Sequence, residues 1–212
     1  MRAYCVLQYA LKFMRKVMLK TRKCDRMTEI NKLEGCGGYM KGIILYKSKY
    51  GATQKYAEWL VEATGFECIE INKAKISEVK KYDVVILGGG IYASGIAGLS
   101  FLKKNIGQLK DKKIIVFCDG ASPFEEKAYQ ELKSHNMKSE LAEIPLVYCR
   151  GSWNMDKMGI IDKKLCKMLQ KVTAKKNLSE CEIWEKALME AGETPCDWTD
   201  RKYIKPILDM LK

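Results

Sequence analysis

Short apolar runs alternate with longer segments of helical periodicity over most of the chain. The runs are rich in β-branched residues and predict five strands, at 43–46, 67–71, 83–87, 114–118 and 144–149. Segments between them space their apolar residues by three and four and predict helices, at 53–64, 99–109 and 124–136. Because apolar strands that alternate with helices form parallel sheets, we predict an α/β fold. The expected architecture is a doubly wound five-stranded parallel sheet with helices on both faces.

The turn after the first strand predicts an anion site. It has one glycine and a hydroxyl at each end, and its residues are Ser48, Lys49, Tyr50, Gly51, Ala52 and Thr53. At a helix start, such a turn offers free backbone N–H groups and the positive end of the helix dipole to an anion. It lacks both the lysine of triphosphate loops and the G-x-G-x-x-G of dinucleotide folds. The turn therefore favours one terminal phosphate, as in FMN, and an ordinary strand-to-helix turn is the alternative.

Two further strand ends also predict binding loops. The strand at 83–87 runs into G-G-G-I-Y-A-S-G at 88–95, and the strand at 114–118 runs into D-G-A-S-P at 119–123. Open parallel sheets bind ligands outside the carboxyl ends of their strands. Three loops of this type at three strand ends therefore favour a cofactor site over a simple turn.

The S-K-Y-G-A-T loop, the G-G-G-I-Y-A-S-G loop and the strand spacing resemble the flavodoxin family from Met40 onward. The resemblance implies strand order 2-1-3-4-5 and FMN as the cofactor, with residues 48–53 at its phosphate. Tyr92 and its neighbours Ala93, Ser94 and Gly95 would lie along the isoalloxazine ring, where a half-buried loop aromatic is the alternative for Tyr92. On the other side of the ring the resemblance places Asp119, Gly120 and Ser122.

Composition limits the remaining chemistry. The nine cysteines form no C-x-x-C pair, so they predict neither a metal site nor a disulfide framework. His135 is the only histidine and lies in a polar run, which indicates a solvated residue. No apolar run is long enough to span a membrane. We therefore expect a cytoplasmic protein without a catalytic side chain.

The first forty residues are strongly basic and contain nine Lys or Arg against three Asp or Glu. They supply half of the formal net charge of +12. We interpret residues 1–39 as an ill-ordered extension or the result of a mis-set start, because Met40 directly precedes the first strand. A functional leader or a basic anchor helix is the alternative. The flavodoxin-like domain would then cover 40–212.

A basic amphipathic segment at about 150–176 interrupts the expected fold. Lysines between Lys157 and Lys176 alternate with an apolar stripe that consists of Met158, Ile161, Leu165, Met168, Leu169 and Val172. We expect the stripe to pack on its own domain, with peripheral contact to the inner face of the cell membrane as the alternative.

The sequence around this insertion also resembles one branch of the family. R-G-S-W-N at 150–154, the lysine-rich segment and a closing helix at 201–211 after a cap at 197–200 resemble the flavodoxin-type, menaquinone-dependent protoporphyrinogen oxidases. Tyr50 departs from that branch, in which an acidic residue is expected.

Three functions follow. The first is an FMN electron carrier that serves a redox partner protein. The second is an oxidoreductase that oxidises a reduced tetrapyrrole and passes electrons to a quinone at the membrane, with Arg150, Lys157, Lys163 and Lys164 attracting anionic groups near the flavin edge. The third is a binding module without flavin. Nucleic acid is not an expected partner, because aromatic residues are sparse between the basic ones.

Overall fold

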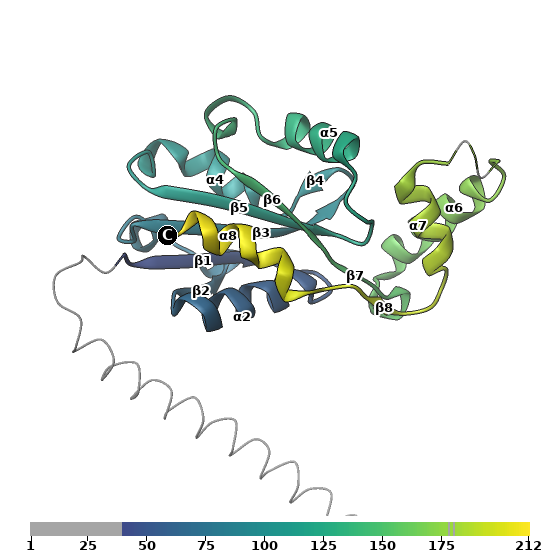
Figure 1. Ribbon diagram of the computed structural model, residues 1–212, viewed down its shortest axis with the longest axis horizontal. Coiled ribbons are helices and arrows are strands. Elements are labelled where there is room, and N and C mark those ends of the chain that lie inside the picture. The colour runs from purple at the N-terminus through teal and green to yellow at the C-terminus, as the bar shows by residue number, and fades with distance from the viewer. Residues whose placement is uncertain (1–39, 178, 180) are drawn as a thin grey trace, which may run out of the picture. The chain divides into compact units, whose positions relative to one another are not determined.

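The computed structural model describes residues 40–177, 179 and 181–212, so the predicted N-terminal extension at 1–39 lies outside the described residues. A parallel sheet forms the centre of this part of the chain (Figure 1). Its order is β2-β1-β3-β5-β6, which confirms the predicted order 2-1-3-4-5. The strands are β1 (Gly42–Lys47), β2 (Glu67–Glu70), β3 (Val84–Tyr92), β5 (Lys113–Gly120) and β6 (Leu146–Arg150).

Two hydrophobic cores cover the two faces of the sheet. Ile44, Ile86 and Phe117 face helices α2 (Ala52–Thr64) and α8 (Lys205–Met210). Leu45, Leu87 and Val116, each one residue before or after these in its strand, face the opposite core. Successive side chains of a strand point to opposite faces, so strands that are apolar throughout are buried on both sides.

Three further helices cover the second core. They are α3 (Ile76–Val79), α4 (Leu99–Asn105) and α5 (Glu126–Asn136). Two predicted helices are divided in the structure: η2 (Ile106–Gln108) continues α4 as a 3₁₀ helix, and η5 (Arg201–Ile204) precedes α8. Asp200 caps η5 by accepting the Lys202 N–H, as expected of the predicted cap.

The three consecutive glycines lie inside β3, so the prediction that a loop begins at Gly88 was wrong. A Cβ added to Gly88 would meet the Phe117 ring at 2.0 Å, and one added to Gly89 would meet the Ala97 carbonyl oxygen at 2.0 Å. Close packing therefore requires glycine here. The strand then turns at Ala93 and Ser94, both with positive φ, and pairs antiparallel with β4 (Gly95–Ile96).

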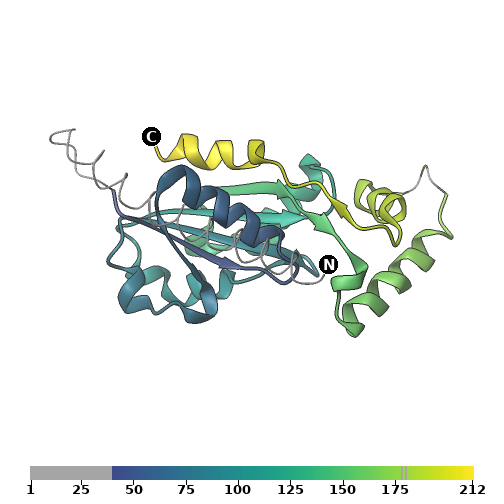
Figure 2. The same cartoon turned by 90° about the horizontal axis from the view of Figure 1, so that it is seen from below.

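Between β6 and the C-terminal helices the chain leaves the sheet. This excursion, residues 152–197, contains β7 (Ser152–Trp153), η4 (Met155–Lys157), α6 (Ile160–Thr173), α7 (Ile183–Ala191) and β8 (Cys196–Asp197). β7 and β8 pair antiparallel and close it at its base. Figures 1 and 2 both place α6 and α7 beyond the carboxyl ends of the parallel strands. We call the rest of residues 40–212 the sheet body.

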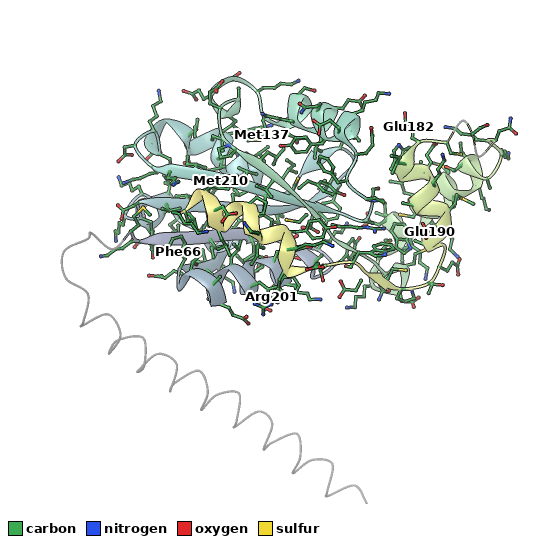
Figure 3. All side chains as sticks on the ribbon, in the orientation of Figure 1. Phe66, Met137, Glu182, Glu190, Arg201 and Met210 are labelled. Carbon is green, nitrogen blue, oxygen red and sulfur yellow. The ribbon has the colours of Figure 1, made fainter. Side chains whose placement is uncertain are left out.

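The excursion has a small core of its own, formed by Trp153, Met155, Leu188 and Ala191. Glu182 and Glu190 mark the two ends of α7 in Figure 3, away from the central sheet. Sequence reasoning described neither α7 nor β8. Among the helices that the structure describes, none is long and apolar enough to cross a membrane.

Candidate functional site

A cavity of about 330 Å³ opens where β1, β3 and β5 end at one edge of the sheet. Parallel strands carry their carboxyl ends to the same edge, which brings together segments far apart in the sequence. Eight of the predicted cofactor-binding residues line this cavity: Ser48, Tyr50, Ala52, Thr53, Tyr92, Ala93, Asp119 and Gly120. Their contact with a cofactor stays a prediction.

The turn at 48–53, which we call the cradle loop, leads from β1 into α2. The Ser48 hydroxyl oxygen accepts the Gly51 N–H at 3.0 Å, which closes the turn. Gly51 has φ 101°, a left-handed conformation that side chains disfavour. No side chain of the described residues caps α2, and its first turn holds no acidic residue. The helix start is therefore open to an anion.

A buried carboxylate lies beside the cradle loop. Asp119, at the end of β5, is 8% exposed and accepts a hydrogen bond from the Thr53 hydroxyl at 2.6 Å. Burial raises the pKa of Asp119 to about 6, although the Thr53 hydrogen bond opposes that rise. Sequence reasoning placed Asp119 in a flexible loop, whereas the structure places it within β5 and next to the cradle loop. The continuous strand pairing of β5 with β6 explains the difference. The position of Asp119 beside the ring stays a prediction.

Tyr92 forms an aromatic wall of the cavity. Its ring packs edge-on against Tyr50, with 6.0 Å between the ring centroids. Lys49 does not line the cavity, but its Nζ lies 5.6 Å from the Tyr92 centroid. Burial raises the pKa of the Tyr92 phenol to about 12, so the phenol stays neutral at physiological pH.

The remaining predicted residues lie around the cavity rather than in its lining. Buried Asn136 fixes the β3–β4 turn, because its side chain donates to the Ser94 carbonyl at 2.7 Å and accepts the Ile96 N–H at 3.1 Å. Gly95 pairs with Tyr92 in the hairpin. The Ser122 carbonyl accepts the Tyr148 hydroxyl at 2.7 Å, which fixes the loop after β5.

The excursion supplies a wall that sequence reasoning did not assign to the site. Its residues in the cavity lining include Trp153, Met158, Asp162, Leu165, Cys166 and Leu169. The apolar stripe was the available signal, because Met158, Leu165 and Leu169 belong to it. Asp162 had no comparable signal in the sequence.

Asp162 connects this wall to the cradle loop. It accepts hydrogen bonds from the Lys49 ammonium and from the Tyr50 hydroxyl. The Lys49 hydrogen bond is the main cause that holds the pKa of Asp162 below its usual value. The same contact raises the pKa of Lys49.

A wider groove of about 790 Å³ adjoins the cavity. The two share five lining residues, which are Ile91, Ala93, Gly120, Ala121 and Leu169. Its aromatic lining comes from Phe124, Tyr129, Tyr148 and Trp184. Neither space is lined by the basic residues expected near a flavin edge, Arg150, Lys157, Lys163 and Lys164. Arg150 instead stacks on Trp198, with 4.3 Å from its Cζ to the ring centroid.

Metal and thiol chemistry have little support in the described part of the chain. Its His, Cys, Asp and Glu side chains form no group of three or more that could hold a metal ion. Cys118 and Cys149 are buried, and burial raises the pKa of both thiols, so they are poor nucleophiles.

A family model described as a flavodoxin domain matches residues 43–179. The chain belongs to the flavodoxin-domain family. No curated protein matches the chain. The family assignment points to a flavin cofactor.

Several solved structures are similar at low identity. A putative flavoprotein from Bacteroides eggerthii is 19% identical, with a TM-score of 0.41 and coverage of 65% of this chain and 99% of that one. A flavodoxin from Megasphaera elsdenii is 20% identical, with a TM-score of 0.38 and coverage of 50% and 82%. A flavoprotein from Lactobacillus acidophilus, in complex with FMN, is 19% identical, with a TM-score of 0.34 and coverage of 52% and 92%.

The donor groups of the cavity fit a flavin nucleotide at both of its ends. The cradle loop offers hydroxyls and an uncapped helix start, which suit a phosphate. Tyr92, Trp153 and Leu165 offer aromatic and apolar walls, which suit a planar ring. Two lining groups do not suit a phosphate. The carboxylates of Asp119 and Asp162 carry the same sign of charge as the phosphate and would repel it.

Proposed function

We propose that the protein binds FMN and transfers electrons through it. One observation carries the proposal: an uncapped helix start with two hydroxyls and a wall of aromatic and apolar side chains meet in one cavity at the carboxyl edge of the sheet. Ser48 and Thr53 would hold the phosphate, and Tyr92 would lie along the ring. The bound flavin supplies the redox chemistry, and the side chains orient it and shield it from water.

The absorption spectrum of the purified protein tests this proposal, because bound oxidised flavin is yellow. Ser48→Ala and Thr53→Ala should each weaken FMN binding by roughly ten- to hundred-fold, the cost of one lost charge-assisted hydrogen bond. Ser77→Ala is the matched control, because Ser77 is exposed on α3. A colourless protein that takes up no FMN would favour the module without flavin, and unchanged affinity in both variants would contradict the assigned site.

One observation favours an enzyme over a simple carrier. The groove adjoins the proposed cofactor cavity and offers aromatic walls at Phe124 and Trp184, which are 52% and 38% exposed. A second ring compound could therefore reach the flavin. The charged side chains of the groove are Glu125, Glu131 and Lys138, so acidic groups outnumber basic ones and the groove does not favour anions. This charge balance suits a quinone better than a tetrapyrrole with carboxylates.

Steady-state oxidation of protoporphyrinogen with a menaquinone analogue tests the enzyme. Turnover above that of free FMN would support it, and Phe124→Ala should then raise the KM for the quinone several-fold with a smaller change in kcat. Turnover no higher than that of free FMN would exclude protoporphyrinogen oxidation. It would leave the electron carrier that serves a redox partner protein as the proposed function.

We also propose that α6 contacts an anionic membrane surface. The expectation that its apolar stripe packs on the domain holds for Met158 and Leu169, which lie against the core of the excursion, but not for most of the stripe. Ile161, Met168 and Val172 are 82%, 55% and 54% exposed. Leu165 lines the cavity and is still 47% exposed, so an apolar face remains open between lysines of α6.

Vesicle co-sedimentation tests the membrane contact. The protein should bind vesicles that contain phosphatidylserine and should bind neutral phosphatidylcholine vesicles much less. Ile161→Ser should lower binding several-fold, whereas Ser77→Ala on the sheet body should not. The proposal would be contradicted if the protein bound both vesicle types equally or bound neither. A partner protein would then be the better candidate to cover the apolar face of α6.

A further inference from the structure

Asp162 is the polar link between α6 and the sheet body. Every other side-chain hydrogen bond or ion pair of α6 in the described residues stays within the excursion, such as those of Lys163 with Asp156 and Lys167 with Glu193. Asp162 alone reaches out, to Lys49 and Tyr50 of the cradle loop. The docking of α6 therefore depends on a carboxylate held by the loop that we assign to the cofactor phosphate.

We infer that Asp162 competes with the cofactor phosphate for the cradle loop and so controls the selection of phosphorylated over unphosphorylated flavin. The inference rests on the proposed function. Asp162 lines the same cavity as Ser48 and Thr53, so a phosphate bound there would meet its carboxylate in addition to that of buried Asp119. One lysine cannot neutralise both Asp162 and a phosphate, and like charges within several ångströms repel.

The contact can be released without disrupting the core. The side chains of Lys49 and Asp162 are 50% and 30% exposed, so both can rotate into solvent. When a phosphate accepts the hydrogen bonds of Lys49 and Tyr50, Asp162 loses both donors. α6 then loses its polar link to the sheet body. Because linkage is reciprocal, the docking of α6 weakens phosphate binding by the same factor by which phosphate weakens docking.

The competition makes the affinity for FMN depend on Asp162 while the affinity for riboflavin does not. Riboflavin has the same ring and ribityl chain but lacks the phosphate. Asp162→Asn keeps the shape and an acceptor oxygen and removes the charge. FMN should bind roughly ten-fold more tightly to this variant than to the wild type, and riboflavin within two-fold of the wild type. Dissociation constants from quenching of flavin fluorescence measure both.

Asp156→Asn is the matched control. Asp156 is an exposed carboxylate of the same excursion, 3.6 Å from Lys163, and it lines neither the cavity nor the groove. It should leave the affinities for both flavins unchanged. Equal effects of the two variants would mean that general charge, rather than the contact with the cradle loop, sets the affinity, and would overturn the inference.

Amide hydrogen exchange supplies a second readout. Adding FMN to the wild type should speed exchange in α6, whereas adding riboflavin should not. If Asp162→Asn leaves FMN affinity unchanged, or weakens FMN and riboflavin equally, Asp162 is only a wall of the cavity and the inference is wrong. If the wild type binds neither flavin, the proposed function fails and the inference falls with it, a result distinct from the first two.

Discussion

The sheet body and the excursion use the same kinds of residues in opposite ways. In the sheet body, apolar side chains on both faces of the strands are buried, as Ile44, Leu45 and Ile86 are, each at 0% exposed. In the excursion, α6 leaves Ile160 and Ile161 at 77% and 82% exposed. A side chain buried in a core stabilises the fold, whereas one left in water indicates a surface for contact. The sheet body supplies most of the cavity lining, and the excursion leaves an apolar face of α6 exposed.

The largest expected effect is a difference in stability loss between core substitutions in the sheet body and surface substitutions in α6. Ile86→Ala should lower the free energy of unfolding by about 3–4 kcal/mol, because it leaves a cavity at a fully buried position of β3. Ile161→Ala removes the same atoms from a side chain that is 82% exposed and should change stability by less than about 0.5 kcal/mol. Chemical denaturation measures both, and similar losses would show that α6 is packed in solution.

A smaller effect is expected within the sheet body at Asp119. Its pKa of about 6 lies above the ordinary value of 3.8, so the folded protein binds the proton more tightly than the unfolded chain. Stability is therefore unaffected below about pH 4, falls as the pH rises to about 6, and stays lowered above that. Asp119→Asn should then stabilise the cofactor-free protein at pH 7 by about 2–3 kcal/mol.

The pH dependence distinguishes this cause from simple repacking. The advantage of Asp119→Asn should shrink as the pH falls from 7 and disappear only below the ordinary pKa of 3.8, where Asp119 is protonated in both states. Thermal unfolding of both proteins between about pH 3 and pH 7 measures it. A difference that does not change with pH would contradict burial of the charge as the cause.

The boundary between the two regions should give a still smaller effect. The Tyr56 hydroxyl donates to the Arg150 carbonyl and accepts the Asp200 N–H at 3.3 Å, so it ties the segments just before and just after the excursion to α2. Tyr56→Phe should lower the free energy of unfolding by about 1–2 kcal/mol, because it leaves these backbone groups without their partner. Faster proteolysis in the excursion than in the sheet body would locate the loss, and uniform loosening would contradict that location.

The smallest effect is expected at an exposed ion pair across the same boundary. Lys55 Nζ lies 2.8 Å from Asp197 Oδ2, and the two side chains are 40% and 56% exposed. Lys55→Met should change stability by less than about 1 kcal/mol, because water and salt screen such pairs. Unfolding at low and high salt measures it, and a loss as large as that of Tyr56→Phe would show that surface charge holds the excursion in place.

The regularity of the sheet body explains why its fold could be predicted. The five parallel strands follow from their apolar runs, and the 48–53 turn lies at the predicted strand end. The need for glycine at 88 and 89 was harder to predict, because it arises from the Phe117 ring and the Ala97 carbonyl, which approach the strand only in the folded chain. The buried site of Asp119 likewise depends on pairing with β6, which no local pattern shows.

The sequence by itself predicted the parallel strands and the cradle loop, because these depend on periodicity and turn chemistry over short stretches of chain. Its resemblance to the flavodoxin family implied the strand order. Only the tertiary structure decided that α6 forms a wall of the cavity, that its apolar face stays open, and that Asp162 meets Lys49. That contact joins residues separated by 113 positions. It depends on how the chain returns to the carboxyl edge of the sheet, which is a property of packing rather than of local sequence.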